Sequence, residues 1–436
     1  MAEECEVMNG FRLAQRSCFL RINLDTVLSN LDVVRQRIGH NTGIIAVVKG
    51  NAYGHGSVML SRFLELRAGI TCFAVGTASE GVELREGGVK ADVIILGVSS
   101  CFEIPTIRAH RLIPSISCLK FLKEWVKHHN DGGHSSNNGV LKQNLFNMFI
   151  PYIIFSVFDA PPFLHDLIKS HVGKVVVGVD TGMRTSGCSI EDLPAVMQLC
   201  ERHEVPVHSL MTHFVDSWED LQLTRDQLHA FLEAVQPYRS RGVPVQAANT
   251  CSVFNGIAAE LDFIRVGVAM YGQPLDSSLA SVEVSEAAGL RPALSMYACA
   301  TKVIELRAGQ SIGYNRGYTC QHDGETFAIL SFGFADGFSR CFRTGHVRTL
   351  QGTICPIVGR VSMDTTTVKI SSKSETIFCV MSHDYSDVNS SATLAKLGNT
   401  TTTETIIRLS KRLPRLYLFN GQMFDIDTGL SKLFTD

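Results

Sequence analysis

The stretch that decides the fold is IIAVVKGNAYGHG, Ile44–Gly56. Its first five residues are all apolar and mostly β-branched, a run typical of a strand buried on both faces. The segment before it, from Leu24 to Ile38, carries apolar side chains at the i, i+3, i+4, i+7 spacing of a helix with one buried face. A helix followed by a doubly buried strand indicates a unit of a parallel sheet.

The same alternation continues outward, from about Ile22 to Tyr271. Helices are expected around 80–85 and 227–235. Roughly eight such units favour a closed (β/α)8 barrel, and an open doubly wound sheet is the alternative. Further strands are predicted at Cys72–Val75, Asp92–Leu96, Leu112–Ile116, Lys174–Val179, Val207–Met211 and Val245–Ala248.

Beyond about Arg291 the helical period fades and short strands separated by glycine-containing turns take over, which predicts a mostly β domain. We expect a barrel domain at 20–285 and a mostly β domain at 286–436 together with 1–19. The predicted strands of the second domain are Ser295–Leu306, Thr326–Phe332, Thr365–Ile370 and Ile377–Val380.

An insertion near 128–152 interrupts the barrel pattern. It begins HHNDGGHSSNNG, which reads as a flexible polar loop. The histidines His128, His129 and His134 could suggest a metal site, but no carboxylate or cysteine stands at ligand spacing, so a solvated loop is the preferred interpretation.

Composition excludes several classes of partner. Forty Lys and Arg against 42 Asp and Glu leave a net charge of -2, which gives no basic surface for nucleic acid or anionic membrane. The longest apolar run, 145–158, falls short of the ~20 residues that a membrane-spanning helix needs. The N-terminus lacks a signal-peptide pattern and the 13 cysteines lack paired spacing. We therefore expect small-molecule ligands, reduced thiols and a cytoplasmic location.

Lys49 is the first candidate for chemistry, because it ends a buried strand. In a barrel this position lies at the mouth formed by the strands' C-terminal ends, where active sites are found. A partly desolvated amine there can form a Schiff base with an aldehyde cofactor, and neighbouring glycines let the backbone approach a ligand. On spacing alone, a lysine that merely caps the strand is about as good an interpretation.

The whole motif around Lys49 resembles the cofactor-lysine motif of the alanine racemase family, fold-type III enzymes that use pyridoxal 5'-phosphate. Six further segments resemble the family in the same order: Val179–Met183, Met211–Phe214, Ala248–Thr250, Ile264–Gly272, Gly313–Tyr314 and Gly333–Gly337; a seventh is Val358–Asp364. The resemblance implies a racemase that interconverts L- and D-alanine, with the cofactor on Lys49.

The resemblance also assigns the residues that hold the cofactor. It implies that Tyr53, Thr250 and the backbone of Gly267 and Val268 bind the phosphate, for which hydroxyl and N–H donors are suited. His213 is placed beside the cofactor. Arg265 is placed opposite the pyridine nitrogen; because a guanidinium donates but never accepts a hydrogen bond, it would keep that nitrogen unprotonated.

Racemisation needs a proton removed from one face and another delivered to the opposite face. The resemblance implies that Lys49 serves one face and Tyr314 the other. In the family this tyrosine reaches into the barrel of a partner subunit, so a homodimer with shared active sites is expected. Because a phenol titrates near ~10, it needs neighbouring positive charge or hydrogen bonds, for which His213 and Arg265 are candidates. The backbone of Met363 is implied to meet the substrate carboxylate.

Several residues depart from the family pattern around the substrate. Gly178 stands where many relatives carry a lysine, and Thr185 where they carry the arginine that contacts the carboxylate; Arg184, one place earlier, is the candidate substitute. Lys411 replaces a frequent tyrosine and Phe334 another. A serine or broader small amino-acid racemase is therefore the alternative to an alanine racemase. A non-catalytic protein that binds pyridoxal phosphate is the alternative of another class.

Overall fold

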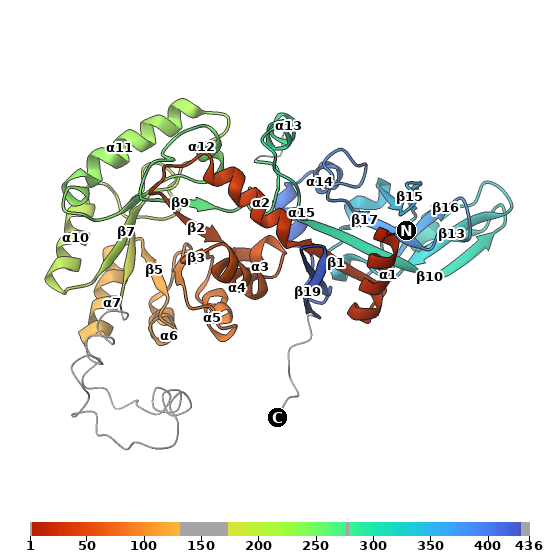
Figure 1. Cartoon of the computed structure of the whole chain (residues 1–436), viewed down its shortest axis with the longest axis horizontal. Helices are drawn as coiled ribbons and strands as arrows, with labels where there is room; N and C mark the ends of the chain where they lie inside the picture. Colours follow the sequence, from red (N-terminus) through yellow and green to blue (C-terminus); the bar gives the residue numbers. More distant parts are fainter. Residues whose placement is uncertain (1, 131–172, 276–278, 429–436) are drawn as a thin grey trace, which may run out of the picture. The chain divides into compact units, whose positions relative to one another are not determined.

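The computed structural model describes residues 2–130, 173–275 and 279–428. Eight parallel strands close into a barrel (Figure 1), so the predicted barrel is confirmed and the open sheet is wrong. The barrel strands are β2 Gly43–Val47, β3 Cys72–Val75, β4 Asp92–Ile95, β5 Ile113–Ile116, β6 Val175–Gly178, β7 Val207–Met211, β8 Val245–Gln246 and β9 Phe263–Val266.

The predicted strands agree with the barrel to within a few residues at each end. The eighth strand, β9, was matched only as part of a motif, because its four residues include an arginine and are followed at once by a glycine. Helix α2 Leu24–Arg35 precedes β2 in the sequence. The helices between the barrel strands in the sequence are α4 Ser57–Arg67, α5 Ala78–Glu86, α6 Ile104–Ala109, α7 Leu119–Asn130, α10 Leu193–Arg202, α11 Leu221–Arg239 and α12 Thr250–Phe254.

Two local expectations need correction or fall outside the described residues. The helix predicted to reach Ile38 ends at Arg35, because the apolar spacing continues into a turn. Residues 128–130, expected to open a polar loop, form the last turn of α7. The remainder of the predicted insertion near 128–152, including His134, lies outside the described residues.

The C-terminal part is built on an antiparallel sheet. Nine strands follow the order β13-β16-β15-β14-β17-β10-β1-β18-β19, and because β13 also pairs with β10, six of them form a closed ring. Their bounds are β1 Cys18–Asn23, β10 Leu294–Leu306, β13 Glu325–Leu330, β14 His346–Thr349, β15 Ile354–Val358, β16 Thr366–Ile370, β17 Ile377–Met381, β18 Arg415–Phe419 and β19 Gln422–Asp427. A separate hairpin pairs β11 Ser311–Ile312 with β12 Tyr318–Thr319.

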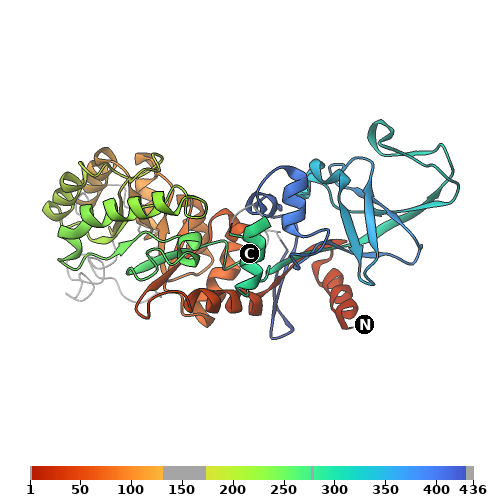
Figure 2. The same cartoon turned by 90° about the horizontal axis from the view of Figure 1, so that it is seen from above.

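The N-terminal segment belongs with this sheet. Strand β1 pairs antiparallel with β10 and parallel with β18, although the expected domain boundary falls inside it. Helix α1, Ala2–Ala14, packs Val7 and Ala14 against Phe19, Tyr297 and Leu416. Figure 2 shows the same elements from above. The boundary at residues 285 and 286 stays a prediction.

The described residues form two compact units by their internal contacts. One comprises residues within 1–37, 50–60 and 266–436, and the other residues within 38–49 and 61–265. The second unit contains the barrel. The first contains the sheet, helices α13 Leu279–Ala287, α14 Ser391–Gly398 and α15 Thr402–Ile407, and the segment that follows Lys49.

Among the described helices none is long and apolar enough to cross a membrane. All 13 cysteines lie in described segments and are free thiols, as expected. Six of them are buried: Cys18, Cys72, Cys188, Cys200, Cys320 and Cys355.

The segment after Lys49 forms a left-handed helical turn. Gly50, Asn51, Ala52 and Tyr53 have φ values of 61°, 55°, 53° and 51°. This conformation costs roughly 1–2 kcal/mol for each non-glycine residue, so the surrounding contacts must hold it. The Asn51 side chain accepts a hydrogen bond from the Ser57 N–H at 2.9 Å, and the Tyr417 hydroxyl donates to the His55 carbonyl at 3.0 Å.

Gly56 should be difficult to replace in this turn. Its φ is 92°, and a Cβ placed there would lie 1.9 Å from the Tyr417 hydroxyl oxygen. Gly88 has a nearly equal φ of 88° with nothing within 4 Å of the added Cβ. We expect Gly88→Ala to cost about 1 kcal/mol and Gly56→Ala about 1–3 kcal/mol more, measured by urea unfolding. Equal losses would show that the Tyr417 contact does not constrain the turn.

Candidate active site

Four residues singled out from the sequence lie at the same end of the barrel. Lys49 follows β2, His213 follows β7, Thr250 follows β8 and Arg265 lies within β9. Because the strands are parallel, their C-terminal ends meet at one mouth, which is where barrel enzymes place their chemistry. Lys49 is exposed there, whereas Thr250 and Arg265 are buried.

Arg265 is the buried charge of this mouth, with 4% of its surface exposed. Its Nη1 donates to the Gln246 side-chain oxygen at 3.0 Å, and its Nη2 donates to the carbonyls of Thr212 at 2.8 Å and Ala247 at 3.0 Å. Burial lowers the pKa of the guanidinium to about 10, which still leaves it protonated at neutral pH. The barrel therefore holds a donor-only cation in a fixed orientation.

His213 accepts a further hydrogen bond from Arg265. The Arg265 Nη2 lies 3.1 Å from the His213 Nδ1. Loss of hydration first, and then the positive charges of Arg265 and Lys49, lower the pKa of His213 to about 3. Since a guanidinium cannot accept a hydrogen bond, Nδ1 must be the acceptor, and the neutral ring carries its proton on Nε2.

The backbone packs closely against Gly178, the position where many relatives carry a lysine. A Cβ at Gly178, in β6, would lie 3.2 Å from the Gly187 Cα, because the loop after β6 folds back onto the strand. Hydrogen bonds from the Asp180 N–H to the Cys188 carbonyl and from the Cys188 N–H to the Gly178 carbonyl, both 2.8 Å, hold the loop there. A lysine at this position would require the loop to shift.

Arg184, the candidate carboxylate ligand, lies in this loop. Its φ is 62°, and its backbone N–H donates to the Asp180 side chain at 3.1 Å. Its side chain is exposed, as is that of Thr185, and it makes no ion pair with a residue that the structure describes. The Asp180 carboxylate thus holds the backbone of the turn at Gly182 and Arg184, and the Arg184 side chain extends into solvent.

Tyr53, Gly267 and Val268 belong to the other unit. The Tyr53 hydroxyl lies against Gly267, where an added Cβ would be 2.9 Å from its oxygen. Burial raises the pKa of Tyr53 to about 12, so its hydroxyl is a hydrogen-bond donor at neutral pH. Its ring stacks on Tyr271, which also stacks on His55. Within the described part of the chain the Val268 N–H donates to no acceptor.

Tyr314 and Met363 project from the sheet unit into solvent. Tyr314 is 71% exposed and Met363 56% exposed. The Tyr314 turn rests on a neighbouring turn, since a Cβ at Gly317 would lie 3.1 Å from the Gly359 Cα. Considering only the described residues, the Met363 N–H has no acceptor, while its carbonyl accepts from Ala335 at 3.0 Å.

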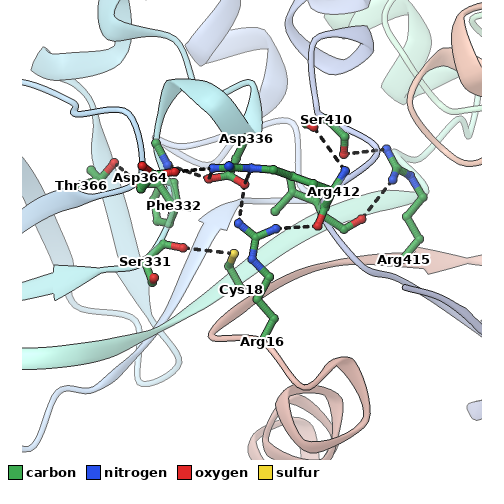
Figure 3. Close-up of polar contacts among 12 residues, drawn as sticks. Arg16, Cys18, Ser331, Phe332, Asp336, Asp364, Thr366, Ser410, Arg412 and Arg415 are labelled. Atoms are coloured by element: carbon green, nitrogen blue, oxygen red, sulfur yellow. Dashed lines mark hydrogen bonds and ion pairs between the residues drawn. The ribbon is translucent and has the colours of Figure 1, made fainter. Parts of the chain in front are cut away.

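A buried carboxylate, Asp336, joins two arginines that are far apart in the sequence, Arg16 and Arg412 (Figure 3). Asp336 is fully buried and accepts hydrogen bonds from the Nε and Nη2 of Arg412, at 2.7 and 2.9 Å, and from the Gly333 N–H at 3.0 Å. Arg16 also pairs with it, and Arg412 reaches Asp364 at 2.8 Å. Burial alone would raise the pKa of Asp336, but these hydrogen bonds lower it overall.

Sequence reasoning missed several of these supporting residues. Arg16 belongs to no motif, and Arg412 lies in the C-terminal motif at Lys411–Arg415, in which only Lys411 was singled out. Gln246 and Gln227 were also missed, because a glutamine in a strand or on a helix face has no motif of its own. Lys411, beside Arg412, is exposed.

The two carboxylates on Arg412 provide a matched test of this network. Asp336 is fully buried, whereas the Asp364 side chain is 63% exposed. Asp336→Asn should cost about 3 kcal/mol of unfolding free energy, since it removes the buried negative charge with which Arg16 and Arg412 pair, and Asp364→Asn less than about 1 kcal/mol. Urea unfolding of both variants checks this, and equal small losses would contradict a central role for Asp336.

His55 should make the fold sensitive to acid. Burial lowers its pKa from 6.5 to about 4, so the unfolded chain binds a proton before the folded chain does. Stability should therefore fall as the pH is lowered from 6.5 towards 4, by up to about 1.4 kcal/mol per pH unit for this group. In His55→Gln the slope of unfolding free energy against pH should be smaller. The exposed His229→Gln serves as control, and an unchanged slope in His55→Gln would refute the assignment.

The chain is similar along most of its length to known alanine racemases. The family described as "Alanine racemase, N-terminal domain" matches residues 22–274, and "Alanine racemase, C-terminal domain" matches residues 293–417. A relative from Macrococcus caseolyticus named alanine racemase is 27% identical over 421 residues, covering 96% of this chain and 98% of the relative.

Solved structures share the fold. An alanine racemase from Clostridium difficile 630 aligns with a TM-score of 0.80 at 21% identity, covering 95% of this chain and 99% of the other. One from Bacillus anthracis, solved with bound L-Ala-P, gives 0.76 at 24% identity, with 94% and 97% covered. Since both domain families match in order and together cover most of the sequence, the chain belongs to the alanine racemase family.

Proposed function

We propose that this protein is a pyridoxal-phosphate-dependent racemase that interconverts L- and D-alanine, with Lys49 and Tyr314 as its two acid/base groups. The proposal is supported above all by the barrel mouth. There the exposed Lys49 lies at the same strand ends as the buried Arg265, which donates a hydrogen bond to the neutral His213. Family membership supplies the reaction, and this geometry supplies groups suited to it.

The residues present fit pyridoxal phosphate. Lys49 offers an accessible amine, and Arg265 offers a donor to a ring nitrogen. The Tyr53 hydroxyl lies over Gly267, at a position that a Cβ would fill. We assign the phosphate to Tyr53, Thr250 and the N–H groups of Gly267 and Val268, a donor set suited to a dianion. When bound, the cofactor supplies an electron sink that makes the substrate Cα–H acidic.

Arg265 restrains that electron sink. Because the Arg265 guanidinium keeps its proton at neutral pH, it would donate a hydrogen bond to the ring nitrogen of the bound cofactor without protonating that nitrogen. Weaker electron withdrawal favours prompt return of the proton to Cα. This choice of partner therefore favours racemisation over chemistry that needs a long-lived carbanion.

The two proton-transferring groups serve opposite faces of the substrate. The Lys49 amine takes or returns the proton on one face, and the Tyr314 phenol acts on the other. Tyr314 is largely exposed on its own unit, which suits a residue that enters the barrel mouth of a second copy. The His213 Nε2–H is the group we assign to the Tyr314 oxygen, where it would stabilise the phenolate. The protein is therefore proposed to work as a homodimer.

Two groups are assigned to the substrate carboxylate. The Met363 N–H has no acceptor among the described residues, and Arg184, in the loop after β6, is exposed and pairs with none of their carboxylates. Gly178 leaves that loop held by backbone contacts instead of by a side chain. Because Lys411 and Phe334 also alter the substrate side, serine or another small amino acid is the second candidate substrate. A cytoplasmic location is proposed with this activity.

The direct test supplies purified protein and pyridoxal phosphate with L-alanine or L-serine in separate reactions. Chiral chromatography should detect the D-enantiomer, with alanine the faster substrate. Faster turnover of serine would select the second candidate. Bound cofactor, seen by its visible absorbance, without turnover of either amino acid would favour a non-catalytic cofactor-binding protein.

Lys49→Ala and Tyr314→Phe should separate the two roles. Lys49→Ala should lose both the visible absorbance and racemisation, because the amine holds the cofactor. Tyr314→Phe should keep the absorbance and lose exchange of the Cα proton on one face only, followed by NMR in D2O. Lys123→Ala, an exposed lysine of α7, and Tyr318→Phe, in the same hairpin as Tyr314, are the controls. Normal racemisation by Tyr314→Phe would disprove the two-base assignment.

A further inference from the structure

Gln227 is a buried polar side chain that belongs to none of the family motifs. It lies on α11 with 3% of its surface exposed. Its side-chain oxygen accepts a hydrogen bond from the Val215 N–H at 2.9 Å. Its Nε2 lies 3.3 Å from the Thr181 hydroxyl and 3.5 Å from the His213 carbonyl. One amide therefore contacts the loops that follow two neighbouring strands, β6 and β7 (Figure 1).

The direction of each hydrogen bond in this cluster can be assigned. The Val215 N–H can only donate, so the Gln227 oxygen accepts and its NH2 group faces Thr181 and the His213 carbonyl. The Thr212 hydroxyl donates to the Val179 carbonyl at 2.9 Å and must accept from Thr181, whose hydroxyl lies at 2.7 Å. The chain of donors runs from Gln227 through Thr181 and Thr212 to Val179. Such directed chains hold their members in one arrangement.

The same cluster holds His213 from its backbone side. Arg265 donates to the ring at Nδ1, and the same Nη2 also donates to the Thr212 carbonyl, one residue earlier in the chain. Gln227 contacts the peptide groups that follow, at His213 and Val215. With the ring held on one side and the backbone on the other, the direction of the Nε2–H is determined.

We propose that Gln227 is a positioning residue for the acid/base reaction: it holds the His213 loop, and with it the direction of the Nε2–H that meets the partner tyrosine. This inference rests on the proposed racemase function. Gln227 is expected to affect only the face of the substrate that Tyr314 serves. Lys49 serves the other face and, among the described residues, makes no hydrogen bond with this cluster. Thr181 is the second member of the same device.

The test compares Gln227→Met, which keeps the size of the side chain, with Gln222→Met. Gln222 is an exposed glutamine on the same helix that bonds only Asp226 among the described residues. In D2O, Gln227→Met should racemise on the order of 10- to 100-fold more slowly, as expected for a misplaced catalytic group. Exchange at Cα without inversion, on the Lys49 face, should stay near the wild-type rate. Gln222→Met should behave as the wild type.

Two further measurements keep the inference falsifiable if Gln227→Met folds poorly. Thr181→Val removes the hydroxyl and should reproduce the one-face defect, whereas Thr181→Ser restores the donor and should rescue it. Independently of the cofactor, amide hydrogen exchange in the segment containing Val215 should accelerate in Gln227→Met, while the barrel strands stay protected.

The outcomes distinguish a failure of the Gln227 inference from a failure of the proposed racemase function. Racemisation by the wild type with both faces slowed equally in Gln227→Met would give Gln227 a merely structural role and overturn the inference. An unchanged rate on both faces would also overturn it. Absence of racemisation by the wild type would instead contradict the proposed function, on which the inference rests.

Discussion

The buried guanidinium of Arg265 is the charge around which the barrel mouth is arranged. Burying an ionised group is expensive unless its donors are satisfied, so the ends of β7 and β8 must present acceptors to it. They do so through the carbonyls of Thr212 and Ala247 and the side chain of Gln246. The remaining acceptor is His213, which is thereby kept neutral with a defined tautomer. The same requirement would prepare both the cofactor contact and the proton transfer that we propose.

The departures from the family pattern at Gly178 and Arg184 also depend on local packing, here at strand β6 and the loop after it. Without a side chain at Gly178, the loop after β6 approaches the strand closely, and backbone hydrogen bonds close it. The Asp180 side chain accepts a hydrogen bond from the Arg184 N–H in this loop. The loop that carries Arg184, which we propose for the substrate carboxylate, is therefore held by backbone packing at Gly178.

Much of the fold was predictable because its signals are local. Runs such as Ile44–Val48 identify doubly buried strands, and the polar turns between them mark the units. Strand β9 was harder to predict because Arg265 interrupts a four-residue run, and β1 because its partners β10 and β18 are hundreds of residues away in sequence. The candidate site came from motifs, whereas Gln227 and the Gly178–Gly187 contact depend on tertiary packing that no local pattern encodes.

The state of the His213 ring is the most direct measure of this account. Imidazole nitrogens labelled with 15N can be followed by NMR at neutral pH, with the signals of His213 assigned by their loss in His213→Gln. The account predicts a neutral ring with an unprotonated Nδ1 and a protonated Nε2, because Nδ1 accepts from Arg265. A doubly protonated ring, or a proton on Nδ1, would contradict it.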